Sequence, residues 1–170
     1  MFVDESGIAT NLVRRYGRAA RGERAAGHAP YGRWERLTVL GGLSLAGLLA
    51  CMVVEGAADT PVVAAFVEHV LVPTLTPGQV VVLDNLSPHH APRVQALVEA
   101  AGCRLLFLPP YSPDFNPIEQ AWSKLKTLLR GAGARTKEAL DDALTAVLDR
   151  LTTADARGWF GNCGYASPAD

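Results

Sequence analysis

The sequence QVVVLDN at residues 79–85 joins a run of four apolar residues to an acidic end. A continuous β-branched run of this kind is typical of a strand buried on both faces. A short helix is predicted over about residues 91–101, where Gly102 stops it, and a second buried strand, RLLFL, follows at 104–108. This order of strand, helix and strand predicts an α/β fold.

The sequence on either side adds three strands and further helices. The strands are predicted to begin at Phe2 and to occupy about 36–42 and about 47–54, and the helices to start at Asp59, at Pro117 (to about 130) and at Thr136 (to about 151). A polar stretch rich in Arg and Gly separates the first strand from the second and is long for a loop, which indicates a functional segment. The order β-ββ-α-β-α-β-α-α predicts a mixed five-stranded sheet with flanking helices.

Composition limits the class of protein. The chain has 170 residues, of which 49% are hydrophobic and 19% charged, so it can bury the core of one ordinary domain. Its three cysteines are far apart and odd in number, which excludes a disulfide framework and favours a reducing cytoplasm. The uncharged stretch 37–54 contains three glycines and has strand-forming residues at both ends, so we expect a hairpin there rather than a membrane helix.

Positive charge gathers in two segments although the formal net charge is only −1. Residues 11–36 contain seven Arg and two Glu, and residues 120–137 contain five basic residues and no acid. Two basic segments in one α/β domain suggest a surface that binds phosphates. Solvated helix and loop faces are the alternative explanation of the same charges.

Three carboxylates fall at the ends of predicted elements. Asp4 is predicted to end the first strand, Asp84 ends the VVVL strand, and Glu119 begins the helix after a proline-rich turn. Ligands collect at the carboxyl ends of strands in open α/β sheets, and three carboxylates there could bind Mg²⁺. Taken singly, however, each acid could equally be a helix cap, a turn residue or a partner of a helix dipole.

The context of these acids resembles a known family. The motifs are FVDESG at 2–7, VVLDNLSPHH at 81–90 and LPPYSPDFNPIEQAWSKLK at 108–126, with 34 residues between Asp84 and Glu119. They resemble the three catalytic motifs of bacterial insertion-sequence transposases in the mariner-like D-D-E superfamily. The resemblance covers nearly the whole chain and is most specific in the proline-rich motif.

The resemblance implies a ribonuclease-H-like catalytic domain, which we assign to residues 1–155, followed by a C-terminal tail at 156–170. It implies Mg²⁺- or Mn²⁺-dependent cleavage of DNA at transposon ends and strand transfer into target DNA, with two ions held by Asp4, Asp84 and Glu119. Asn85 and His89 match auxiliary positions of the family. We do not expect Glu5 to be a ligand, because strand alternation directs it away from the face of Asp4.

The resemblance also implies double-stranded DNA as partner, a homodimer in the active complex and action in the bacterial cytoplasm, at the nucleoid. Ser123, Lys126 and Arg130 share the helix face of Glu119 at 100° per residue. We expect these three residues, together with Arg14 and Arg15, to contact DNA. The three Trp residues are expected to pack in the interior rather than to stack on bases.

Two other functions stay open. Family members usually carry N-terminal helix-turn-helix modules, and none precedes Asp4 in this sequence. We therefore expect a second reading frame or a fragment, with weak, sequence-independent DNA binding. The alternatives are a non-autonomous DNA-binding remnant of a decayed element and a stand-alone ribonuclease-H-like nuclease.

Overall fold

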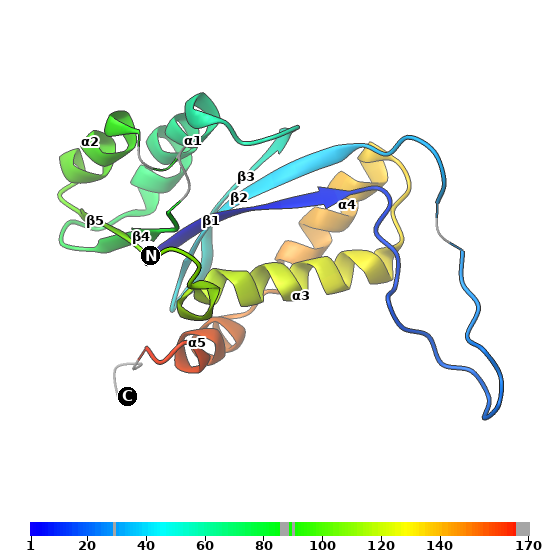
Figure 1. Ribbon diagram of the computed structural model, residues 1–170. Helices are drawn as coiled ribbons and strands as arrows, with labels where there is room; N and C mark the ends of the chain where they lie inside the picture. The colour runs from blue at the N-terminus through cyan, green and yellow to red at the C-terminus, as the bar shows by residue number, and fades with distance from the viewer. Residues whose placement is uncertain (29, 86–88, 90, 166–170) are drawn as a thin grey trace.

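The computed structural model describes residues 1–28, 30–85, 89 and 91–165. Five strands form one sheet: β1 (Phe2–Ala9), β2 (Arg36–Ser44), β3 (Gly47–Glu55), β4 (Val80–Leu83) and β5 (Arg104–Phe107). Their order is β3-β2-β1-β4-β5, with β1, β4 and β5 parallel and β2 antiparallel to both of its neighbours (Figure 1). The mixed five-stranded sheet predicted from the sequence is confirmed.

Within the described residues, five α-helices flank the sheet: α1 (Thr60–Phe66), α2 (Pro92–Ala100), α3 (Pro117–Ala132), α4 (Lys137–Leu148) and α5 (Thr153–Asn162). The structure also contains a π-helical turn at Val67–Leu71 and 3-10 turns at Val72–Thr74 and Pro113–Phe115. The predicted start of α1 is confirmed, because the Asp59 side chain accepts a hydrogen bond from the Val62 backbone at 3.1 Å.

Each face of the sheet covers a separate core. Phe2 and Ile8 of β1 pack in a cluster with residues of α3, α4 and α5, whereas Val3 packs with residues of α1 and α2. The two helical groups accordingly lie on opposite sides of the sheet (Figure 1). Because side chains alternate along a strand, even-numbered residues of β1 face α3 and odd-numbered ones face α1 and α2. This alternation decides which acids of β1 can meet the helices on each side.

Three features differ from the sequence predictions. β1 continues to Ala9, so Asp4 lies inside the strand instead of ending it. β5 is an edge strand whose Leu106 is 49% exposed, and β4 is fully buried only at Val81 and Leu83. A run of apolar residues does not reveal whether its strand lies at the centre or at the edge of the sheet. An edge strand is more exposed because it has a neighbouring strand on one side only.

The segment predicted to be a tail begins as a core helix. α5 starts with a capping box between Thr152 and Asp155, and its Ala156 and Phe160 are buried. The Phe160 ring meets the Phe2 ring edge to face at a centroid distance of 5.4 Å. Two glycines within this short helix mask its helical pattern in the sequence. The boundary between domain and tail stays a prediction.

In the long polar segment between β1 and β2, the described residues 10–28 and 30–35 form an arm that extends away from the sheet (Figure 1). Its base is closed by hydrogen bonds between Thr10 and Glu35. The uncharged stretch 37–54 forms β2 and β3, and no helix in the described part of the chain is long and apolar enough to span a membrane.

Candidate active site

The parallel register of β1 and β4 brings two of the predicted catalytic carboxylates to neighbouring positions. Val3 pairs with Leu83, so the next residues, Asp4 and Asp84, follow side by side along the two central strands. Asp4 is only 6% exposed, whereas Asp84 is half-buried at the end of β4. The adjacency depends on a strand pairing across about 80 residues of sequence.

The third carboxylate comes from α3. The loop after β5 passes through Tyr111, whose φ of 56° is left-handed, and through a 3-10 turn before Pro117 begins the helix. Proline suits the first turn of a helix, because its missing N–H would have no partner there. Glu119 is therefore exposed on the first turn of α3.

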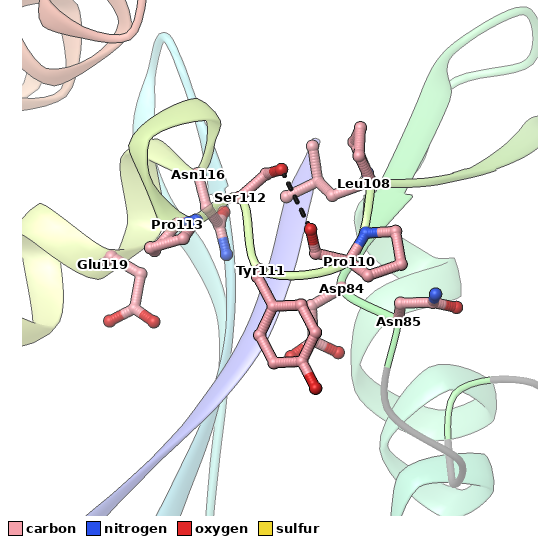
Figure 2. A pocket seen from close by; sticks show the side chains of 10 residues that line it. Asp84, Asn85, Leu108, Pro110, Tyr111, Ser112, Pro113, Asn116 and Glu119 are labelled. Atoms are coloured by element: carbon pink, nitrogen blue, oxygen red, sulfur yellow. Dashed lines mark hydrogen bonds between the residues drawn. The ribbon is translucent and has the colours of Figure 1, made fainter.

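Asp84 and Glu119 line one cavity of about 370 Å³. Figure 2 shows Glu119 on one side of this cavity and Asn85 on the other, with Asp84 between them. The rest of the wall is the proline-rich loop 108–113 and Asn116. Asn116 is buried, and its Oδ1 has no hydrogen-bond partner in the described part of the chain.

Asp4 is held by a tryptophan that the sequence analysis assigns to packing alone. Trp122 is 2% exposed, and its Nε1 donates a hydrogen bond to Asp4 Oδ2 at 3.1 Å. The indole fits over Gly41, the residue of β2 paired with Asp4. A Cβ at Gly41 would lie 2.6 Å from Trp122 Cη2, so only glycine leaves room for the ring. Asp4, Gly41 and Trp122 thus form one packed unit.

The environment of Asp4 favours its neutral form. Burial raises the pKa of Asp4 to about 7, and the negative charges of Glu119, Glu5 and Asp84 act in the same direction, against a hydrogen bond with the backbone of Glu5. A cation near Asp4 would favour the ionised carboxylate instead. Binding of a divalent cation is therefore expected to release a proton at neutral pH and to weaken as the pH falls.

The shifted pKa predicts how stability depends on pH. The folded pKa of Asp4 lies above its unfolded value, so the stability that Asp4 contributes is fully present below about pH 4 and is lost as the pH rises through about 7. In EDTA at pH 8, Asp4→Asn should raise the free energy of unfolding by about 2 kcal/mol, because an amide carries no charge. Urea unfolding at pH 8 and pH 4 measures the difference. A gain of equal size at both pH values would contradict this assignment.

His89 connects Asp84 to a second acid. Its Nδ1 lies 2.5 Å from Asp84 Oδ1, and its Nε2 lies 3.0 Å from Glu5 Oε2. Burial lowers the pKa of His89, but the hydrogen bonds to Asp84 and Glu5 outweigh it and raise the pKa to about 10. The expectation that Glu5 points away from the face of Asp4 agrees with this geometry. The sequence alone does not show that Glu5 reaches the Asp84 carboxylate through the imidazole.

The donors of this site suit a hard divalent cation. Asp4, Asp84 and Glu119 offer carboxylate oxygens, which Mg²⁺ and Mn²⁺ prefer. In the described part of the chain, however, no three acidic, His or Cys side chains gather closely enough to form a metal-binding cluster. Glu119 is exposed and has a long side chain. A change of its rotamer is therefore the simplest way to bring its carboxylate close to those of Asp4 and Asp84.

The structure brings some of the predicted DNA-binding residues together. Arg14 and Arg15 of the arm line a cavity of about 260 Å³ with Arg130 of α3. Lys126 is half-buried on α3, while Ser123 is exposed and lines a different cavity, beside Lys124 and Trp159. The two basic segments of the sequence therefore meet at the C-terminal half of α3.

Comparison with known proteins identifies a family that contains most of the chain. Residues 1–141 match the family described as DDE superfamily endonuclease. Among curated proteins, no sequence matches the chain.

Three solved structures show the same fold. The Mos1 transposase paired-end complex with left transposon end has a TM-score of 0.70 and 16% sequence identity, and the match covers 95% of this chain and 51% of that chain. The Mos1 mariner paired end complex with Mn has a TM-score of 0.63 and 16% identity, with 96% of this chain and 52% of that chain covered. The catalytic domain of Mos1 mariner transposase has a TM-score of 0.64 and 13% identity, with 96% of this chain and 77% of that chain covered. The chain thus spans about half the length of the transposase chain in the first of these complexes. The ribonuclease-H-like fold implied by the motifs is confirmed, and the chain belongs to the family of DDE superfamily endonucleases.

Proposed function

We propose that the chain is the catalytic domain of a transposase that cleaves DNA strands at transposon ends and joins them to target DNA. The observation that carries this proposal is the register Val3–Leu83, which sets Asp4 beside Asp84, while Asp84 and Glu119 line one cavity. Nicking of supercoiled plasmid DNA in Mg²⁺ or Mn²⁺, with and without each carboxylate, tests it.

Asp4, Asp84 and Glu119 would hold the divalent cations, two in number. When bound, the cations would stabilise the charge that develops on a phosphodiester and assist deprotonation of the attacking water or 3′-hydroxyl. The chain's own residues orient the site: Trp122 holds Asp4 by its indole N–H, and His89 holds Asp84. Asp4 must lose its proton to act as a ligand, so activity should rise with pH through about 7.

The solved structures support the choice of partners. They are Mos1 complexes with a transposon end and with Mn, and the paired-end arrangement supports a dimer in the active complex of this chain. Asp84 and Glu119 at one cavity, with Asp4 beside Asp84 on the neighbouring strand, favour an active domain over a non-catalytic remnant.

Contact between DNA and α3 gives a measurable prediction. If the face that carries Glu119 follows the DNA backbone, Lys126→Ala combined with Arg130→Ala should weaken binding to duplex DNA. Two fewer phosphate contacts should also lower the slope of log K against log salt by about two. Fluorescence anisotropy at several salt concentrations measures both effects.

The control for this prediction should remove a positive charge that lies away from the Glu119 face of α3 and has no structural role. Lys124, on another face of α3, forms an ion pair with Asp155 of α5 at 2.5 Å, so its removal would also disturb the packing of two helices. Arg150, exposed after α4, is a better match. An equal loss of affinity in Arg150→Ala would mean that overall charge, and not the α3 face, holds DNA.

A further inference from the structure

A continuous series of three polar side chains leads from the α1 and α2 side of the sheet to the cavity. Glu5 of β1 contacts His89 Nε2, and His89 Nδ1 contacts Asp84, at 3.0 and 2.5 Å. The imidazole is 2% exposed, and the Glu5 and Asp84 side chains are 19% and 31% exposed. The imidazole is therefore buried between two more exposed carboxylates, of which Asp84 lines the cavity.

The geometry exceeds what a structural histidine needs. One hydrogen bond at either ring nitrogen would satisfy much of the polarity of a buried imidazole, but it would leave the ring able to turn about that contact. In His89 both ring nitrogens contact carboxylates, Nδ1 that of Asp84 and Nε2 that of Glu5, and these two acids belong to separate strand segments. The two contacts together fix the plane of the ring and the direction in which Nδ1 points. A fixed Nδ1 in turn fixes the position of Asp84 Oδ1.

The position of Glu5 shows why this strand residue can serve the site although it faces away from Asp4. Asp84 stands at the end of β4, where the sheet no longer separates the two faces, and a residue from either side can reach it. Trp122 approaches Asp4 from the α3 side, and His89 approaches Asp84 with Glu5 behind it. Each aspartate thus contacts a ring nitrogen of a buried side chain, Trp122 for Asp4 and His89 for Asp84.

We infer that Glu5 is a positioning residue of the active site: through His89 it holds the Asp84 carboxylate in the orientation in which it binds a divalent cation. The inference rests on the proposed function, because it takes Asp84 as a cation ligand. Groups that orient a ligand from behind typically change metal affinity by about 10- to 100-fold when they are removed. Glu5 is therefore expected to affect cation binding without touching the cation.

The test is a double-mutant cycle read out by Mn²⁺ binding in electron paramagnetic resonance titrations of the full chain at pH 8. Glu5→Gln should weaken Mn²⁺ binding about tenfold. His89→Asn keeps an amide donor near the position of Nδ1 but cannot reach Glu5. In this background Glu5→Gln should have no further effect, because the connection is already broken.

A signal in the metal-free protein complements the binding data. In spectra of ¹⁵N-histidine-labelled protein, the His89 resonances, assigned by their loss in His89→Asn, should shift in Glu5→Gln at both ring nitrogens. Glu35→Gln, which removes an exposed acid, should leave Mn²⁺ affinity and the spectrum unchanged. Glu5→Asp, which keeps the charge but shortens the side chain, should reproduce the loss of affinity if Glu5→Gln fails to fold.

The outcomes separate this inference from the proposed function. Unchanged Mn²⁺ affinity in Glu5→Gln, or the same tenfold loss with and without His89, would overturn the positioning role. If at the same time Asp84→Asn abolishes Mn²⁺ binding, the catalytic assignment stands and only the role of Glu5 fails. Unchanged binding in Asp84→Asn would overturn both.

Discussion

Asp84→Asn should reduce cation-dependent nicking of supercoiled DNA by about 10³-fold or more, because the several kcal/mol of charge stabilisation that a bound cation supplies would be lost. The amide keeps the size of the side chain and can still accept a hydrogen bond from His89 Nδ1. The fold should therefore survive, as judged by circular dichroism and the thermal midpoint. Conversion of supercoiled to open-circular plasmid in Mg²⁺ and in Mn²⁺ gives the rate.

Asp142→Asn provides the matched control, since Asp142 is exposed on α4 and does not line the cavity. Its nicking rate should equal that of the unmodified chain. A rate near normal in Asp84→Asn would remove Asp84 from the catalytic set. Equal losses in both variants would show that nicking responds to overall charge and not to this carboxylate.

Gly41→Ala should both destabilise the protein and impair the site, although it adds a single methyl group. The new Cβ would lie 2.6 Å from Trp122 Cη2 and 3.0 Å from Leu48 Cδ1, so the buried indole must move. Overpacking of this kind costs about 1–3 kcal/mol of unfolding free energy. Displacement of the ring also breaks its hydrogen bond to Asp4, and nicking should fall by more than tenfold, a loss of about 1.4 kcal/mol or more.

Two further variants distinguish the steric effect of Gly41→Ala from the loss of the hydrogen bond between Trp122 and Asp4. Gly7→Ala changes a glycine of β1 that has nothing within 4 Å of an added Cβ, so its stability should change by no more than about 0.5 kcal/mol. Trp122→Phe in the Gly41→Ala background removes the clashing ring atoms but not the need for a donor to Asp4. It should restore part of the stability and none of the nicking. Wild-type nicking in the double variant would show that the indole N–H plays no part.

Much of the fold can be predicted from local patterns. The VVVL and RLLFL runs, the uncharged hairpin segment and the proline before Glu119 place β4, β5, β2, β3 and α3 close to their observed bounds, because such patterns report backbone preference and periodicity. Local patterns do not report how many neighbours an element has. For this reason β5 is predicted to be buried although it is an edge strand, and the glycine-containing α5 is predicted to be a tail.

The candidate site likewise has a part that the sequence predicts and a part that it does not. Asp4, Asp84 and Glu119 can be named from the sequence because each stands in a motif that resembles one of the three catalytic motifs of the family. His89 is also named from its motif, but the roles of Trp122 and Glu5 could not be assigned: Trp122 contacts Asp4 across 118 positions, and Glu5 meets His89 across 84. Such contacts require strand pairing and helix packing to bring distant residues together. The sequence therefore specifies which chemical groups the site contains, and the tertiary fold specifies how they are oriented.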